Sequence, residues 1–244
     1  MSASAEHAAR GRSIATVCLS GTLEDKLAAA AEAGFTGIEV FEPDLIASPW
    51  SPEELAARCA DLGLAIELYQ PFRDLDSTDA DRFARNLRRA EHTFDVMARL
   101  GVDTALVCSS VRPDAVADVD RLAEQLALAA GRAGERGLRI AYEALAWGTH
   151  VSTWEHSWEA VRRADSPALG LCLDSFHVLS RGGDPAGFAA VPEEKLFFVQ
   201  IADAPRLRMD VLQWSRHHRL FPGQGAFDLV GFAAAVLDLG YSGP

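Results

Sequence analysis

The sequence predicts an α/β fold of the TIM (βα)8-type barrel. Seven apolar strand patterns alternate with seven helical segments along the 244 residues, and such alternation indicates parallel strands with helices packed outside them. A chain of this length suits one α/β barrel without a second domain. The competing architecture is a doubly wound open sheet, but the first strand lacks the Gly-rich turn that follows it in nucleotide-binding sheets.

Each predicted strand is a short apolar run between polar, Gly or Pro residues. In chain order the strands cover residues 13–19, 37–41, 65–70, 104–108, 139–143, 169–174 and 196–200. Short runs of this kind are typical of strands buried in a parallel sheet. Between each pair of runs there is room for the crossover that joins parallel neighbours.

The predicted helices combine apolar residues at helical spacing with start and stop signals. In chain order they cover residues 23–33, 51–63, 81–100, 115–136, 153–164, 184–190 and 227–239. Gly34 ends the first, because glycine readily adopts the conformation that follows a helix. Ser51-Pro52-Glu53-Glu54 starts the second with a cap, a proline in the first turn and acids that complement the helix dipole. Residues 42–50 and 202–225 are expected to be loops.

An eighth strand would begin where the chain reaches Tyr241-Ser242-Gly243-Pro244. A barrel of this type closes with eight strands, so we expect the last βα unit, a strand and a helix, to lie beyond residue 244. Residues 13–244 then form one TIM-barrel domain. Residues 1–12 are small and polar and are expected to be a flexible N-terminus.

The composition favours a cytoplasmic protein that acts on small molecules. The formal net charge is −12 without a long basic stripe, which argues against nucleic acid as a partner. The N-terminus lacks the apolar stretch of a signal peptide, and no run is long enough for a membrane helix. The four cysteines, Cys18, Cys59, Cys108 and Cys172, form no C-x-x-C pair and are expected to be reduced, structural residues.

Three predicted strands end on oxygen ligands, at Glu143, Asp174 and Gln200, with intervals of 31 and 26 residues. One strand–helix unit of a barrel takes about 30 residues, so the three side chains are expected on successive strands at the same end. The carboxyl ends of barrel strands form the catalytic face, and oxygen ligands that converge there can hold a divalent metal ion. Glu39 and Glu42 also lie at a strand end, but they receive no role.

Eight blocks of sequence extend this interpretation. They are residues 14–21 (IATVCLSG), 39–42 (EVFE), 69–74 (YQPFRD), 142–148 (YEALAWG), 173–177 (LDSFH), 200–205 (QIADAP), 214–217 (WSRH) and 221–225 (FPGQG). With them the chain resembles the sugar-phosphate isomerase/epimerase superfamily of xylose-isomerase-like barrels, and within it bacterial 3-dehydroshikimate dehydratases. The resemblance covers essentially the whole chain.

The resemblance implies one divalent metal ion, held by Glu, Asp, Gln or His, and a second Glu. The first three match Glu143, Asp174 and Gln200; the fourth would come from the eighth strand, so we expect weak metal binding by the 244 residues alone. Oxygen ligation favours Mg²⁺ or Mn²⁺, and Co²⁺ often substitutes in this family.

The implied reaction is the dehydration of 3-dehydroshikimate to protocatechuate through an enolate that the metal stabilises. His177, three residues after Asp174, is the expected base, because imidazole titrates near neutral pH. Arg219 is a further catalytic candidate. Expected substrate-binding residues are Tyr69, Arg73, Ser215 and Arg216, since an Arg fork suits the substrate carboxylate.

Three alternatives remain open at this point. An isomerase or epimerase acting on a ketose or inositol-like sugar would use the same enolate and return the proton. A DNA-repair endonuclease on this fold would need a His-rich site and a basic surface, which this acidic chain lacks. A metal-free binding module is the third. The sequence also leaves open a homo-oligomer or a fusion to a C-terminal domain.

Overall fold

The computed structural model describes residues 11–244. The flexible N-terminus predicted for residues 1–12 therefore lies outside the described part, except for its last two residues. Seven parallel strands form one sheet in sequential order. They are β1 (Ser13–Ala15), β2 (Gly37–Phe41), β3 (Ala65–Phe72), β4 (Thr104–Cys108), β5 (Arg139–Glu143), β6 (Leu169–Asp174) and β7 (Leu196–Gln200).

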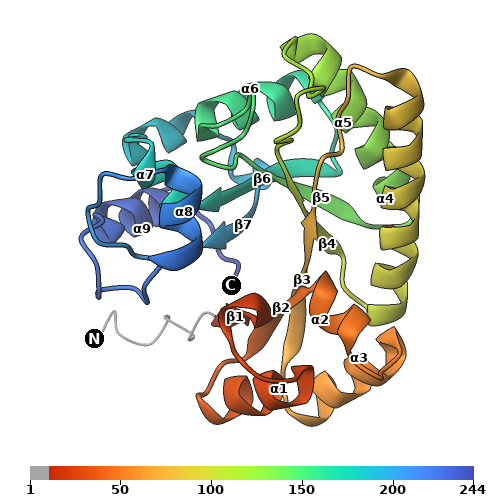
Figure 1. The fold of residues 1–244 in the computed structure, drawn as a ribbon, viewed down its shortest axis with the longest axis vertical. Helices are drawn as coiled ribbons and strands as arrows, with labels where there is room; N and C mark the ends of the chain where they lie inside the picture. Colours follow the sequence, from red (N-terminus) through yellow and green to blue (C-terminus); the bar gives the residue numbers. More distant parts are fainter. Residues whose placement is uncertain (1–10) are drawn as a thin grey trace, which may run out of the picture.

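The sheet curves into an open barrel with the helices on its outside (Figure 1). Among residues 11–244, β1 and β7 are the two edge strands, and they are not paired with each other. The last residues of the chain lie beside the start of β1, since a Cβ placed on Gly11 would be 4.0 Å from the Cβ of Pro244. The predicted α/β barrel is therefore confirmed, with seven strands in the described residues.

The helices follow the strands in the alternating order that the sequence predicts. They are α1 (Leu23–Glu32), α2 (Glu42–Ala47), α3 (Pro52–Asp61), α4 (Ala80–Leu100), α5 (Val119–Gly134), α6 (Trp154–Ala164), α7 (Ser175–Ser180), α8 (Val211–His217) and α9 (Leu229–Asp238). Three short 3₁₀ helices are η1 (Thr16–Cys18), η2 (Pro185–Ala190) and η3 (Glu193–Lys195). Side-chain capping boxes at Thr22 and Ser51 start α1 and α3.

Two sequence-based boundaries at the carboxyl ends of the first strands are wrong. The first strand ends at Ala15 rather than at residue 19, because the chain turns into η1 and the Thr16 hydroxyl accepts the Phe41 N–H at 3.0 Å. As a result Cys18 is exposed and is not part of a buried strand. Residues 42–47, predicted as loop, form α2 with Pro43 in its first turn.

Two further helices occur where the sequence predicts none. Residues 175–180 form α7, which Asp174 caps by accepting the N–H groups of Phe176 and His177. Residues 211–217, inside the predicted long loop, form α8, which Asp210 caps. Both helices are six or seven residues long, too short to show a clear helical period, and side-chain caps and tertiary contacts stabilise them instead.

The barrel interior contains a small apolar layer beneath the carboxyl ends of the strands. Its buried members are Leu68, Leu106, Cys108, Ala141, Leu145, Cys172 and Phe198. The larger core lies between the sheet and the surrounding helices, with Phe94, Phe188 and Phe232 fully buried. Packed apolar layers on both faces make the sheet a rigid support for polar side chains at the strand ends. In the part of the chain that the structure describes, no helix has both the length and the apolar character that membrane crossing requires.

Candidate metal centre

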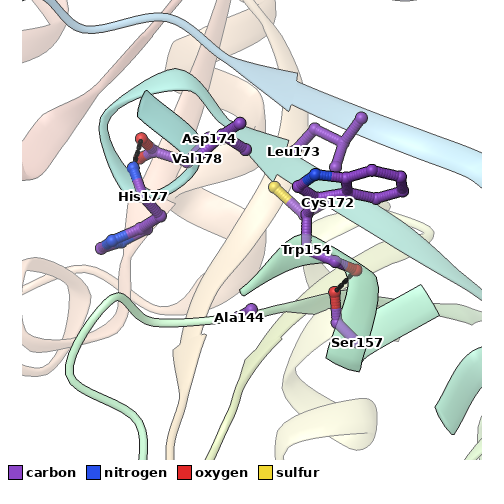
Figure 2. Close-up of a pocket in the computed structure, with 8 residues that line it drawn as sticks. All are labelled: Ala144, Trp154, Ser157, Cys172, Leu173, Asp174, His177 and Val178. Atoms are coloured by element: carbon purple, nitrogen blue, oxygen red, sulfur yellow. Dashed lines mark hydrogen bonds between the residues drawn. The ribbon is translucent and has the colours of Figure 1, made fainter. Parts of the chain in front are cut away.

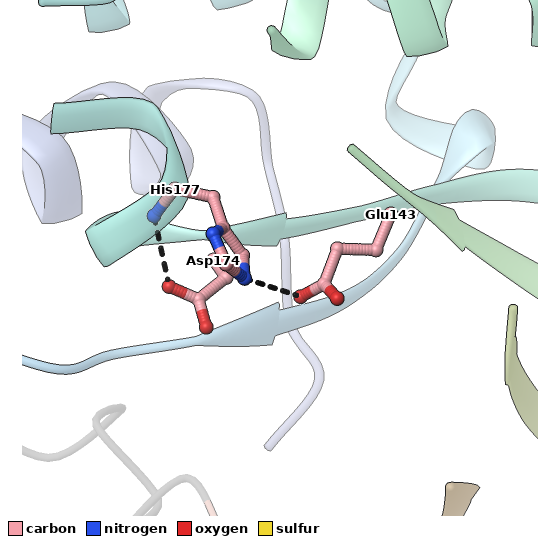
Figure 3. Close-up of side chains that lie close together, drawn as sticks. All are labelled: Glu143, Asp174 and His177. Atoms are coloured by element: carbon pink, nitrogen blue, oxygen red, sulfur yellow. Dashed lines mark hydrogen bonds and ion pairs between the residues drawn. The ribbon is translucent and has the colours of Figure 1, made fainter. Parts of the chain in front are cut away.

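Buried carboxylates meet at the carboxyl ends of the strands, above the apolar layer. Glu143 ends β5, Asp174 ends β6, and His177 lies in the first turn of α7. One ligand atom of each lies within 4.8 Å of the others, and all three residues are buried (Figure 3). Asp174 pairs in register with Gln200 on β7. The sheet therefore places Glu143, Asp174 and Gln200 at the ends of adjacent strands, as the sequence predicts.

Asp174 has a structural and an electrostatic role. Its Oδ1 accepts the N–H groups of Phe176 and His177 at 2.7 and 3.2 Å, which starts α7. Its Oδ2 accepts from Nη1 of Arg219 at 2.6 Å. Burial would raise the pKa of Asp174, but Arg219, His177 and these hydrogen bonds hold it below its usual value. Asp174 is therefore an ionised carboxylate.

Glu143 lies in a less favourable environment for a charge. Burial, and then the repulsion of Asp174, raise the pKa of Glu143 to about 8. The Cys108 thiol on β4 donates to its Oε2 at 3.3 Å. Its Oε1 lies 3.9 Å from Nε2 of His177, too far for a hydrogen bond. Glu143 thus has an oxygen that a cation could bind.

Glu39 is a third buried carboxylate in this region, and the sequence analysis assigns it no role. It lies on β2, and its Oε2 accepts from Nε2 of Gln200 at 2.5 Å and from Nε2 of Gln70 at 2.6 Å. Burial raises the pKa of Glu39 to about 7, against the lowering effect of these two hydrogen bonds. The signal that could have indicated it is a Glu in the middle of an otherwise apolar strand, where buried charge needs a partner.

His177 has both ring nitrogens next to N–H donors. Nδ1 accepts from the Ala146 N–H at 3.2 Å, and Nε2 lies 3.2 Å from Nη2 of Arg219. A neutral imidazole has one acceptor nitrogen, so the ring satisfies one of these contacts in either tautomer. Burial, together with Arg219 and Arg73, lowers the pKa of His177 to about 3. The ring is therefore neutral, contrary to the expectation that it titrates near neutral pH, and its Nε2 is the nitrogen that faces Glu143.

Arg219 reaches the carboxylates from the segment that follows α8. Its Nε contacts the Ser215 hydroxyl at 3.2 Å, and its guanidinium lies over the Phe176 ring at 4.6 Å. Two sequence-predicted residues, Ser215 and Arg219, are thus joined to Asp174 and His177 in one network.

The other predicted substrate-binding residues lie farther out or in different surroundings. Tyr69 is buried on β3, and burial together with Glu42 raises the pKa of its hydroxyl. Arg73 is exposed just after β3, close enough for its charge to act on Glu143 and His177. Arg216 is exposed on α8. The substrate roles of these three residues stay predictions.

A small cavity lies behind Asp174 and His177, between β6, α6 and α7 (Figure 2). Trp154 and Ser157 of α6 line it together with Cys172 of β6, and it holds about 10 Å³, room for no more than one water molecule. It is a packing gap on the outer side of β6, not a pocket for a ring-sized substrate.

The donor set fits a divalent cation. Within residues 11–244, Arg219 is the only Arg or Lys that forms an ion pair with Glu39, Glu143 or Asp174. Burial, and after it the repulsion from Asp174, raises the pKa of Glu39 and Glu143, and one guanidinium does not offset these effects. A bound cation would relieve this repulsion, and carboxylate, amide and imidazole groups suit a hard or borderline divalent ion.

Comparison with known proteins places the fold in a family. The family described as "Xylose isomerase-like TIM barrel" matches residues 27–244. The 3-dehydroshikimate dehydratase of Pseudomonas aeruginosa is 60% identical over 233 residues, which are 96% of this chain and 37% of that protein. The 3-dehydroshikimate dehydratase of Neurospora crassa is 30% identical over 266 residues, covering 85% of this chain and 74% of that protein.

A solved structure agrees with these sequence matches. A "xylose isomerase-like TIM barrel/4-hydroxyphenylpyruvate dioxygenase fusion protein" superimposes with a TM-score of 0.95 at 56% identity, over 96% of this chain and 38% of the fusion protein. The chain thus spans little more than a third of the length of the Pseudomonas aeruginosa enzyme and of the fusion protein. By fold and by sequence, the chain belongs to the xylose isomerase-like TIM barrel family.

Proposed function

We propose that the protein is a metal-dependent 3-dehydroshikimate dehydratase, a carbon–oxygen lyase. The observation that carries the proposal is 60% identity along 96% of the chain to a protein with that name. The strand-end carboxylates alone would support any member of the superfamily, because fold and metal ligands are shared by several chemistries. Identity of this extent includes the loops that surround the site.

Glu143, Asp174 and Gln200 are the residues that would hold the ion, since they end adjacent strands β5, β6 and β7. When bound, Mg²⁺, Mn²⁺ or Co²⁺ supplies a Lewis acid for the ketone of the substrate, an effect of several kcal/mol. Asp174 is the ionised ligand in the metal-free protein, whereas Glu39 and Glu143 have raised pKa values. Binding of the ion is therefore coupled to proton release.

The reaction removes one α-proton and the β-hydroxyl of 3-dehydroshikimate as water. We assign the proton transfer to Nε2 of His177, which faces the carboxylate cluster and is unprotonated in the tautomer that the Arg219 contact favours. The same proton then leaves with the hydroxyl group, and the dienone tautomerises to protocatechuate. A positioned acid–base group of this kind contributes about 10²- to 10⁴-fold in rate.

Guanidinium groups near the cluster suit the carboxylate of the substrate. Arg219 is half-buried beside Asp174, whereas the side chains of Arg73 and Arg216 are exposed. An Arg can bind a carboxylate through two parallel hydrogen bonds. We assign orientation of the substrate to these arginines, with Tyr69 and Ser215 as hydrogen-bond donors.

The experiment is a spectrophotometric assay of protocatechuate formation from 3-dehydroshikimate. Activity is expected with Mg²⁺, Mn²⁺ or Co²⁺ and is expected to disappear with EDTA. His177→Ala should lower kcat by about 10²-fold or more, while the matched variant His217→Ala on α8, an exposed histidine, should be unaffected. Metal-loaded, folded protein that forms no protocatechuate would refute the proposal.

The isomerase alternative has a weaker observation behind it. The "Inosose isomerase" of Bacillus subtilis is 32% identical over 92 residues, only 38% of this chain. An isomerase would exchange the substrate α-proton with deuterium from the solvent without forming an aromatic product. Running the assay in D₂O with both 3-dehydroshikimate and an inosose separates the two activities.

A further inference from the structure

Glu39 joins the two ends of the open sheet through side chains. Glu39 lies on β2 and Gln70 on the neighbouring strand β3. Gln200 lies on β7, 161 residues after Glu39 in the chain. The sheet itself provides no hydrogen bonds between β7 and the β1–β2 edge among the described residues. The contact of Glu39 with Gln200 therefore links strands that the backbone leaves separate.

Both glutamine amides donate to the same oxygen, Oε2 of Glu39, at 2.5 and 2.6 Å. That oxygen is an acceptor whether or not the carboxyl group is protonated. Gln200 must therefore turn its NH₂ group towards Glu39. Its carbonyl oxygen is then the atom that remains for another partner.

This orientation matters because the two ends of an amide differ as ligands. The carbonyl oxygen can coordinate a cation, whereas the NH₂ group is a donor. Groups that hydrogen-bond to a ligand residue fix its orientation, and their removal typically costs about 10- to 100-fold in metal affinity. Gln70 restrains Glu39 in turn, because it is buried and donates from the neighbouring strand.

We propose that Glu39 is a positioning residue that fixes the Gln200 amide so that its carbonyl oxygen, not its NH₂ group, faces the metal ion. The inference rests on the proposed function, in which Gln200 is a metal ligand. It assigns a role to a buried acid that does not itself need to contact the ion.

The test measures Co²⁺ affinity by isothermal titration calorimetry and, separately, by competition with a chromophoric chelator. Glu39→Ala should weaken binding by about 10- to 100-fold. Glu39→Gln keeps an acceptor oxygen but removes the negative charge, so it should stay much closer to wild type. Equal losses in Glu39→Ala and Glu39→Gln would mean that Glu39 acts through charge alone, and would overturn the proposal.

A double-mutant cycle with Gln200→Ala tests the route of the effect. If Glu39 acts through Gln200, Glu39→Ala should cause no further loss of affinity in the Gln200→Ala background; the full loss in both backgrounds would contradict the proposal. Glu67→Ala, on β3 with its side chain beside Gly37 at the amino end of β2, is the matched control, and circular dichroism checks folding. Wild-type protein that binds no Co²⁺ would refute the metal site itself, whereas wild-type binding that Glu39→Ala leaves unchanged would refute only the role of Glu39.

Discussion

At the scale of single residues, the electrostatics of the site depend on a single Arg, because Arg219 is the only Arg or Lys in the described residues that forms an ion pair with one of its buried carboxylates. Asp174 caps α7 with one oxygen and accepts from Arg219 with the other. The guanidinium thus occupies the position next to a proposed metal ligand. A cation of higher charge nearby would take over part of its electrostatic role, because both stabilise the same ionised carboxylate.

Arg219→Ala should therefore destabilise the metal-free protein more than the metal-loaded protein. Removing one partner leaves Asp174 buried without its ion pair, and we expect a loss of about 3 kcal/mol in the free energy of unfolding. With saturating Co²⁺ the loss should be smaller. Urea unfolding with EDTA and with Co²⁺ measures both values. Arg216→Ala, exposed on the same segment, should change stability by less than about 0.5 kcal/mol; a loss for Arg219→Ala that is equal in both conditions would contradict the argument.

At the scale of elements, the segment of residues 203–227 brings Arg219 to the barrel mouth. Asp203 closes the base of this segment: its carboxylate accepts N–H groups from Ala204, Gly223, Gly225 and Phe227. Backbone hydrogen bonds in both directions between Asp203 and Leu220 add to this closure. Gly225 has no room for a side chain, since a Cβ there would lie 2.3 Å from Oδ1 of Asp203. The backbone N–H groups hold the pKa of Asp203 below its usual value, although burial opposes them.

Asp203→Ala should loosen this segment without unfolding the barrel. Four N–H groups lose a charged acceptor, and each such hydrogen bond contributes about 1.5 kcal/mol or more. Hydrogen–deuterium exchange of peptides from residues 203–227 should become at least about tenfold faster, while peptides from α4 stay protected. Asp210→Ala, which removes only the cap of α8, should speed exchange in residues 211–217 alone. Unchanged exchange at residues 223–227 in Asp203→Ala would show that other contacts hold the segment.

At the scale of the whole molecule, the barrel and three strand ends were predictable because they follow from local pattern. The strands that end at Glu143, Asp174 and Gln200 have the predicted bounds, since each is an apolar run next to a single polar residue. The short helices α7 and α8 were not predictable, because caps and tertiary contacts decide them. The contact of Glu39 with Gln200 spans 161 residues and becomes visible only when the sheet curves. Sequence pattern thus indicates which residues end the strands, but not which of them face each other.

The buried acids at the barrel mouth also predict how the stability of the metal-free protein depends on pH. In the folded state the pKa values of Glu39 and Glu143 are raised to about 7 and about 8, whereas an unfolded Glu titrates near 4.3. The folded protein therefore binds these protons more tightly. Their contribution to stability is present below the unfolded pKa and is lost as pH rises through the two folded values. His177, whose pKa folding lowers to about 3, opposes this decline below its unfolded value of about 6.5, but the two glutamates outweigh one histidine. In EDTA the melting temperature should therefore fall between pH 5.5 and pH 8.5, by scanning calorimetry.

The chain has a net charge of −12, and its self-repulsion also grows with pH. The part of the fall in melting temperature that comes from Glu39 and Glu143 must therefore be measured separately. Glu143→Gln is neutral at every pH and should flatten the decline, whereas Glu124→Gln, exposed on α5, should leave it unchanged. Saturating Co²⁺ should reverse the trend, because the ion binds the ionised carboxylates and stabilises the fold more at pH 8.5 than at pH 5.5. A metal-free melting temperature that rises over this range, or the same decline in Glu143→Gln, would contradict the raised pKa values of these buried acids in the folded, metal-free protein.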